Sequence, residues 1–228
     1  MKNALIVGAG PGLSASLARR FAAEGLNVAL AARNTPKLES LCREISATAF
    51  HCDASDPQSV DTLFDQLSDH SLTPDLVVYN AGSYTRGPVA DLDMEQVRDV
   101  LMANAFGALL VARLATRAML EAGGGSLLFT GASAGIKGYA QSAPFAMGKF
   151  ALRGLCQSLA RELSPQNIHV AHFVIDGSIY QPERGAPYDN PDKTLHPDEI
   201  AKTYWSVATQ DRSTWTWEVE LRPYTEPF

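Results

Sequence analysis

The sequence has few cysteines and no excess of positive charge, and each shortage excludes a class of protein. Its three cysteines, Cys42, Cys52 and Cys156, are odd in number and have no CxxC spacing. They predict neither a disulfide framework nor a zinc site, and they suit the reducing cytoplasm. The 19 Lys and Arg are scattered among 25 Asp and Glu, which gives a net charge of −6. We therefore expect neither a nucleic acid nor an anionic membrane as a partner.

Several other features are missing from the chain. No His, Cys, Asp and Glu residues cluster at metal-ligand spacing, so we expect no metal. The first residues, MKNALIVG, read as a strand rather than a secretory leader, and no apolar run suggests a membrane span. Internal repeats and linkers are lacking too. A hydrophobic content of 46% then predicts one soluble cytoplasmic domain over residues 1–228.

What the sequence does contain is an alternation of short apolar runs with stretches of helical period. This order predicts an α/β fold of βαβ units on a parallel sheet, with helices on both faces. The apolar runs are 4–7, 28–31, 47–52, 76–79, 127–130 and 169–175. The helical stretches are 13–24, 37–46, 58–68, 94–121 and 145–163, followed by a short helix from His196 and a last strand from Thr214.

A glycine-rich loop, VGAGPGLSAS, lies between the first apolar run and the first helical stretch. Gly8, Gly10 and Gly12 allow a tight turn and a close approach to a pyrophosphate, whose charge a helix N-terminus favours. Leu13 opens that helix and joins the expected cofactor contacts. Glycines also serve ordinary strand-to-helix turns, but this place at the start of an alternating chain favours a dinucleotide.

The residues about twenty positions after this loop indicate which dinucleotide binds. A NAD site has an acid there for the ribose hydroxyl, whereas this chain reads ALAARN, with Ala32 followed by Arg33. Arginine suits a 2′-phosphate through bidentate hydrogen bonds, and an acid would repel it. We therefore predict NADP(H) in preference to NAD(H), against the alternative that Arg33 only solvates the strand end.

With the glycine loop, four motifs make the chain resemble the short-chain dehydrogenase/reductase family. They are CDASD at 52–56, YNAG at 79–82, NAFG at 104–107 and a helix carrying Lys149, in the family's order over nearly the whole chain. The resemblance implies a single Rossmann-type domain, a doubly wound seven-stranded parallel sheet in three layers. It also implies a small-molecule substrate and a homo-dimer or homo-tetramer formed through the helices at 94–121 and 145–163.

The resemblance implies roles for individual residues. Asn104 would take the place of the family's helix-bending asparagine in the proton relay, and Lys149 would hold the nicotinamide ribose. The other implied cofactor contacts are Asp53, Asn80, Ala81, Gly82, Gly177 and Ile179. Structural alternatives remain open: Asp53 as a turn residue, Asn80 and Gly82 as a strand-end turn, and Asn104 as a polar kink.

The sequence departs from the family pattern where the chemistry takes place. The catalytic tyrosine falls on Phe145, four residues before Lys149, and the catalytic serine falls on Ala132. Phenylalanine cannot carry a proton, so a general acid that contributes about 100- to 10,000-fold in rate is missing. The chain thus resembles a divergent subgroup with phenylalanine at this position. Ser14 also replaces a glycine, with slight crowding expected at the pyrophosphate, and Asp176 replaces a proline.

Two residues are candidates to supply the missing oxygens. Ser133 adjoins Ala132, and Tyr139 lies in the loop before the helix of Phe145, which in this family borders the substrate. Either side chain could instead be only pocket wall. We expect His169 and His172, which do not share a face of the sixth strand, to be structural.

The loop at 178–197 carries four prolines, too many for a regular element. Because loops at the carboxyl ends of parallel strands surround the ligand, we expect a substrate-side lid here, with a plain connector as the alternative.

Two functions remain for the chain. The first is an NADP(H)-dependent oxidoreductase with an atypical site, which reduces an activated carbon–carbon double bond or a reactive carbonyl in a small apolar substrate. The second is a non-catalytic NADP(H)-binding redox sensor or partner subunit. We favour the enzyme because Asn104 and Lys149 are kept beside the missing acid.

Overall fold

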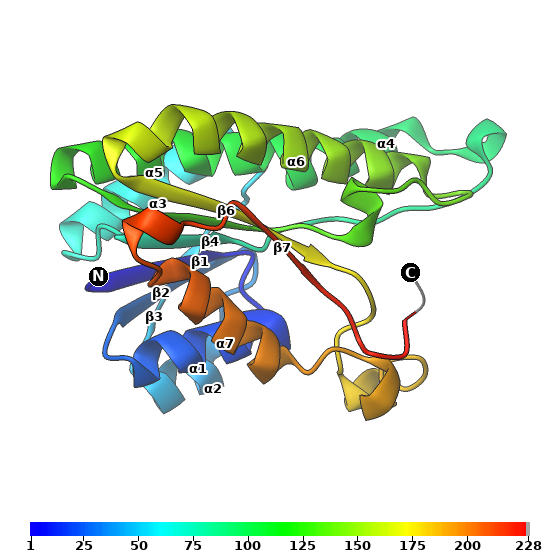
Figure 1. Cartoon of the computed structure of the whole chain (residues 1–228), viewed down its shortest axis with the longest axis horizontal. Coiled ribbons are helices and arrows are strands. Elements are labelled where there is room, and N and C mark those ends of the chain that lie inside the picture. Colours follow the sequence, from blue (N-terminus) through cyan, green and yellow to red (C-terminus); the bar gives the residue numbers. More distant parts are fainter. Residues whose placement is uncertain (227–228) are drawn as a thin grey trace.

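A single parallel sheet forms the middle layer of the protein, in a computed structural model that describes residues 1–226 (Figure 1). Its seven strands stand in the order β3-β2-β1-β4-β5-β6-β7, and all neighbours are parallel. The order reverses between β1 and β4, where such sheets bind ligands at the carboxyl ends of the strands. The strands are β1 Asn3–Val7, β2 Asn27–Ala32, β3 Thr48–His51, β4 Leu76–Tyr79, β5 Gly125–Thr130, β6 Ile168–Ile175 and β7 Glu218–Leu221.

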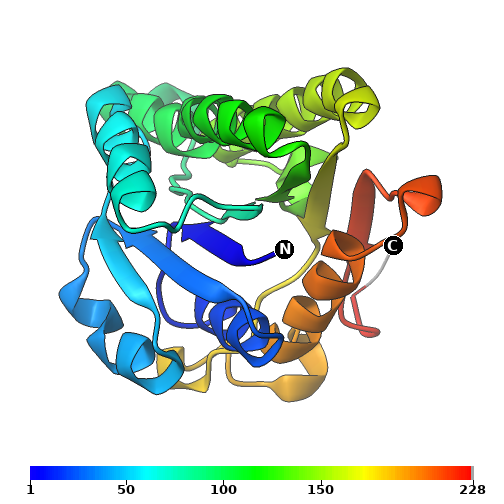
Figure 2. The same cartoon turned by 90° about the vertical axis from the view of Figure 1, so that its left-hand side faces the viewer.

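Helices cover both faces of the sheet, so the predicted doubly wound fold is confirmed (Figures 1 and 2). One face is covered by α3 Pro57–Asp69, α4 Met94–Leu101, α5 Gly107–Ala122 and α6 Ala143–Leu163, and the other by α1 Leu13–Ala23, α2 Glu39–Ile45 and α7 Pro197–Ala208. All eight residues of β6 are buried. Strands enclosed in this way need apolar side chains on both faces, which explains the continuous apolar runs.

The helical stretch predicted at 94–121 is interrupted by a π-helical turn, Met102–Phe106, which joins α4 to α5. Asn104 lies in this turn and is fully buried. Its Nδ2 donates hydrogen bonds to the carbonyl oxygens of Val100, at 2.9 Å, and Ser83, at 2.7 Å. The side chain therefore bonds to its own helix and also fixes the loop after β4, at a kind of helical bulge that often marks functional sites.

The same stretch, Met94–Ala122, is long and apolar enough to cross a membrane by length and composition. The sequence suggested no such span, so that expectation needs correction. In the structure 44% of the apolar window is buried, and the helices of this stretch pack against the sheet and against α6. Core helices that cover a sheet pass the same test of length and composition.

The C-terminal segment differs from the prediction at its start. A strand was expected from Thr214, but a 3-10 turn occupies Arg212–Thr214 and β7 begins at Glu218. The loop at 178–197 folds back on itself, because Ile179 and Leu195 form a bridge between its two ends. In Figure 1 this yellow and orange loop lies beyond the carboxyl ends of the strands, on the side of α7.

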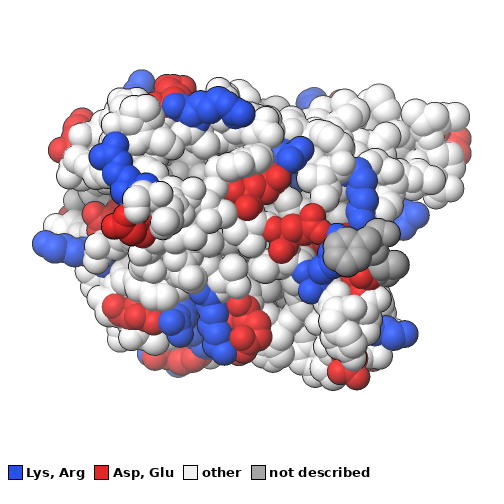
Figure 3. All heavy atoms as spheres, viewed as in Figure 1, with Lys and Arg blue, Asp and Glu red and all other residues white. Residues whose placement is uncertain are grey.

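Charged side chains of both signs are interspersed on the face shown in Figure 3, without a continuous basic stripe. Several cations have acidic partners, such as Arg19 with Glu44 and Arg113 with Asp61. Among residues 1–226, no group of three His, Cys, Asp or Glu side chains is placed to hold a metal ion.

Candidate active site

The glycine loop is pressed against the residues that follow β4. Gly8 has a φ of 86°, and a Cβ built on it would lie 2.3 Å from the backbone nitrogen of Ala81. Only glycine fits such a contact without moving the backbone. Gly12, with a φ of 83°, is the N-cap of α1 and has no side chain to satisfy the first amides of that helix. The loop therefore offers free backbone donors at a helix N-terminus, as a pyrophosphate requires.

Ser14, in place of the family's third glycine, fixes the loop to the sheet. Its buried hydroxyl donates to the carbonyl oxygen of Gly8 at 3.1 Å and accepts from Asn80 Nδ2 at 2.7 Å. We expected this residue to crowd the pyrophosphate, but its oxygen is engaged with the loop's own backbone and with the end of β4. Ser14 is absent from the lining of the adjacent groove.

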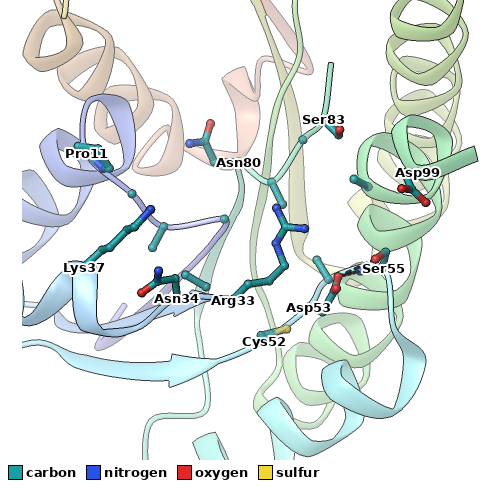
Figure 4. Close-up of a pocket in the computed structure, with 18 residues that line it drawn as sticks. Pro11, Arg33, Asn34, Lys37, Cys52, Asp53, Ser55, Asn80, Ser83 and Asp99 are labelled. Carbon is teal, nitrogen blue, oxygen red and sulfur yellow. Dashed lines mark hydrogen bonds between the residues drawn. The ribbon is translucent and has the colours of Figure 1, made fainter. Parts of the chain in front are cut away.

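A groove of about 520 Å³ runs along the carboxyl ends of β1, β2, β3 and β4 (Figure 4). The structure brings seven of the predicted cofactor residues to it: Gly8, Gly10, Arg33, Asp53, Asn80, Ala81 and Gly82. Five others do not line it: Gly12, Leu13, Lys149, Gly177 and Ile179. Gly12 and Leu13 lie at the start of α1, with Leu13 packed in the core, while Gly177 faces Pro223 and Ile179 pairs with Leu195.

Two cations, Arg33 and Lys37, line the part of the groove that adjoins the end of β2. Figure 4 shows the Arg33 and Lys37 side chains directed into the cavity, with Asn34 between them in sequence. The sequence reading did not include Lys37 or Asn34. In the sequence, Lys37 is recognisable only as a cation four residues after Arg33. It lies in a 3-10 turn, Pro36–Leu38, and only the fold determines how this turn is oriented.

Asp53 lies at the opposite wall of this end of the groove. Its Oδ1 accepts from Ser55 Oγ at 2.6 Å and from the Ser55 backbone amide at 3.0 Å. The Ser55 side chain is the main cause that lowers the pKa of Asp53, with a smaller contribution from Arg33. The carboxylate is thus oriented and ionised, and its contact with adenine stays a prediction.

Gly82, Asn104 and Lys149 come together where the groove ends after β4. Lys149 is buried, and its Nζ donates to the carbonyl oxygen of Thr130 at 2.9 Å. A Cβ on Gly82 would lie 2.9 Å from Asn104 Oδ1 and 3.8 Å from Lys149 Nζ, so the three residues converge. Burial lowers the pKa of Lys149 to about 8. Asn104 Oδ1 is buried and has no hydrogen-bond partner in the described chain. Because buried polar atoms are normally hydrogen-bonded, this oxygen could accept a hydrogen bond from a bound polar group.

Phe145 lines a second cavity, of about 480 Å³. Its ring centroid is 5.7 Å from Lys149 Nζ and 5.0 Å from the Tyr84 ring, which meets it edge to face. Ser133 and Tyr139 also line this cavity, whereas Ala132 does not. The structure therefore brings both candidate hydroxyls to Phe145. Tyr84 and Arg86, which complete the walls, carried no motif that the sequence reading could use.

Tyr139 has a lysine neighbour, but it is Lys137 rather than Lys149. Lys137 Nζ lies 5.7 Å from the centroid of the Tyr139 ring and 3.3 Å from Asp176 Oδ2. The Tyr139 side chain, and then Asp176, raise the pKa of Lys137. Asp176 is buried and also pairs with Arg222 at 3.1 Å, so the residue that replaces the family's proline joins two loops by ion pairs.

The two histidines of β6 are packed inside the fold. His169 stacks on Trp215 at 4.7 Å between ring centroids. His172 Nδ1 lies 3.0 Å from Glu218 Oε2, and Arg153 binds the same carboxylate through two nitrogens. Burial lowers the pKa of both imidazoles. No residue of 178–197 lines either cavity, so the lid stays a prediction.

This geometry has clear counterparts among known proteins. Residues 2–177 match the family model described as short chain dehydrogenase. Trans-4-hydroxycyclohexanecarboxylate dehydrogenase of Sinomonas cyclohexanicum is 33% identical, over 79% of this chain and 73% of its own. The 3-oxoacyl-(acyl-carrier-protein) reductase MabA of Mycobacterium tuberculosis is 30% identical, over 78% of this chain and 69% of its own.

Solved structures agree in fold over nearly the whole chain. A short-chain dehydrogenase from Rhodopseudomonas palustris superposes with a TM-score of 0.84 and 34% identity, covering 98% of this chain and 99% of that one. A metagenomic short-chain oxidoreductase in complex with NADP has a TM-score of 0.83 and 27% identity, and 97% of each chain is covered.

Proposed function

Because this chain belongs to the short-chain dehydrogenase/reductase family, we propose that it is an NADP(H)-dependent oxidoreductase whose active site lacks the family's catalytic tyrosine and serine. The observation that carries the proposal is the convergence of Gly82, Asn104 and Lys149 at one end of a groove whose other end holds Arg33 and Lys37. A dinucleotide spans such a groove, with its adenosine phosphate at the two cations and its nicotinamide ribose at the lysine.

The choice of NADP(H) rests on charge. Ala32 leaves the end of β2 without an acid, and Arg33 and Lys37 together supply two positive charges to a 2′-phosphate. Arginine binds a phosphate in a bidentate fashion, while lysine contributes a point charge. The NADP bound to the metagenomic relative supports this choice by analogy.

The bound nicotinamide would supply or accept a hydride, and the chain's own residues govern binding and proton transfer. Lys149 would donate a hydrogen bond to the ribose while Thr130 holds its Nζ. Phe145 would form an apolar wall that excludes water from the reacting carbon. At the substrate oxygen, Tyr139 would donate the proton and Ser133 would donate a hydrogen bond, since both line the cavity beside Phe145.

The proposed substrate class follows from the absence of the catalytic tyrosine at position 145, because this weakens general acid catalysis. Without a phenol next to Lys149, an unactivated ketone would react slowly, because the developing alkoxide lacks a positioned acid. An activated carbon–carbon double bond or a reactive carbonyl needs less acid catalysis, and the aromatic wall of Phe145 and Tyr84 favours a substrate with an apolar body.

We also propose that the protein is located in the cytoplasm.

A second candidate function is a non-catalytic NADP(H)-binding sensor or partner subunit. The observation that favours it is the loss of two oxygens, at Ala132 and Phe145, from a site that keeps its cofactor residues. In that case cofactor binding would shift a loop or an interface rather than begin a reaction.

Calorimetric titration of the purified protein with NADPH and with NADH tests the binding shared by both functions. We expect micromolar binding that prefers NADPH, and binding of neither cofactor would overturn both. Turnover of NADPH with a panel of enones, aldehydes and dicarbonyls then separates the two functions. Consumption above the solvent background supports the oxidoreductase, and its absence with every compound supports the sensor.

A further inference from the structure

The cavity beside Phe145 has aromatic walls and one charged side chain, Arg86. Several arginines of this acidic chain pair with a carboxylate, as Arg98 does with Glu95. Within residues 1–226, by contrast, Arg86 pairs with no carboxylate and no other acceptor. The nearby Lys137 is already paired with Asp176. The cavity therefore has one unbalanced positive charge at its wall.

Resting on the proposed function, we propose that the substrate carries a carboxylate, which Arg86 binds, while Phe145, Tyr84 and Tyr139 enclose its apolar body. Guanidinium and carboxylate match in plane and spacing, so two parallel hydrogen bonds can form. A single unpaired cation balances a monoanion. A phosphate dianion would need a second cation, whereas Arg86 is the one charged side chain of the lining and Lys137, beside Tyr139, is paired with Asp176.

The segment that carries Arg86 is held on both sides. The carbonyl of Ser83 accepts from Asn104 Nδ2, and Thr85 Oγ1 donates to Gln96 Oε1 at 3.0 Å. The amide of Gly87 donates to the carbonyl oxygen of Gln141 at 2.9 Å, in the loop that carries Tyr139. The backbone on either side of Arg86 is thus fixed before any ligand arrives, which lowers the entropy lost on binding.

The cavity size sets a limit on the substrate. A volume of about 480 Å³ accommodates a ring or short chain with one polar group at each end. The reacting carbonyl would lie toward Phe145 and Lys149, and the carboxylate would lie at Arg86. The proposed substrate thus has the apolar body that the sequence predicts and, in addition, a carboxylate at one end.

A binding experiment tests this substrate class without any turnover. The NADPH-loaded protein is titrated calorimetrically with 4-methylbenzoate and with 4-methylbenzamide, a neutral compound of the same shape. We expect the carboxylate to bind at least about tenfold tighter, a difference of about 1.4 kcal/mol. Arg86→Gln should abolish this preference, and Arg86→Lys should keep part of it. The control variant Arg113→Gln, which removes an arginine of α5 that pairs with Asp61, should leave the preference intact.

Equal binding of the two compounds, or a preference that survives Arg86→Gln, would overturn the inference. A parallel assay with 4-formylbenzoate and 4-formylbenzamide separates this failure from failure of the proposed function. Reduction of both aldehydes with equal efficiency leaves the oxidoreductase standing and refutes the carboxylate site. An Arg86-dependent preference in binding, without reduction of either aldehyde, supports the carboxylate site and refutes the oxidoreductase.

Discussion

At the scale of single residues, we expect Arg33 to contribute most to the proposed preference for NADP(H). It follows β2 directly and points into the cavity (Figure 4). Removing its charged hydrogen bonds, which contribute about 1.5–3 kcal/mol, should weaken NADPH binding about 10- to 100-fold in Arg33→Ala and leave NADH nearly unchanged. Calorimetry on this variant and on Arg43→Ala, outside the groove, checks the prediction, and equal losses for both cofactors would contradict it.

Lys149 gives a pH dependence of stability with a defined sign. Its folded pKa of about 8 lies below the ordinary value of 10.5, so between these values the unfolded chain keeps a proton that the folded chain has lost. The free energy of unfolding should therefore rise with pH in this window, by at most about 1.4 kcal/mol per pH unit, with no such rise below pH 8. We expect Lys149→Met to lack this rise.

Urea unfolding of the two proteins at about pH 7 and about pH 9.5 measures the effect. The wild-type protein should gain stability relative to Lys149→Met at the higher pH. A constant difference between the two proteins would show that the ammonium of Lys149 has its ordinary pKa.

At the scale of elements, the glycines of the loop between β1 and α1 have different tasks. A Cβ at Gly8 would strike Ala81, whereas a Cβ at Gly10 meets nothing within 4 Å. Gly8→Ala should cost about 2 kcal/mol or more and lower the Tm by several degrees. Gly10→Ala should keep its Tm yet weaken NADPH binding, because its methyl group would stand where the pyrophosphate approaches. Thermal unfolding with calorimetry checks both, and an unchanged Tm in Gly8→Ala would contradict the close contact.

The first turn of α6 and the residue before the 3-10 turn Ser133–Gly135 carry the two altered positions. Restoring both oxygens in Phe145→Tyr with Ala132→Ser places a phenol next to Lys149, and carbonyl reduction should rise about 100-fold or more. The NADPH-dependent rate with an aldehyde measures it, and Phe145→Leu serves as the matched control. Unchanged turnover in a variant that still binds NADPH would show that the two positions are not those of the family's tyrosine and serine.

At the scale of the whole molecule, α5 and α6 present apolar side chains to solvent. Leu109 on α5 is 44% exposed, and Phe150 on α6 is 45% exposed. Phe106, in the π-helical turn before α5, is a third exposed apolar side chain. We propose that these helices meet a second copy of the chain in a homo-dimer or homo-tetramer. Leu109→Glu with Phe150→Glu should then give a monomer in light scattering, while Val89→Glu, on an exposed turn, should not change the mass. A wild-type monomer would contradict the assembly.

The sequence alone determined the elements and their order. Apolar runs such as 76–79 and the glycines of the first loop are local signals, because strand burial and tight turns act over a few residues. A bend at Asn104 was expected, but its form as a π-helical turn and the bond from Asn104 to Ser83, a residue distant in sequence, were not predicted. Likewise β7 begins at Glu218, whose side chain binds Arg153 and His172, residues distant in sequence.

The tertiary structure alone decided which side chains share a site. Lys37, Tyr84 and Arg86 had no motif, yet the fold turns them into the two cavities, whereas Gly177 and Ile179 lie outside both. Tyr139 was a candidate to supply a missing oxygen, and the fold places it in one cavity with Phe145 and next to Lys137. A motif records spacing along one element, but a site joins the ends of several elements. Their meeting depends on how the whole chain packs.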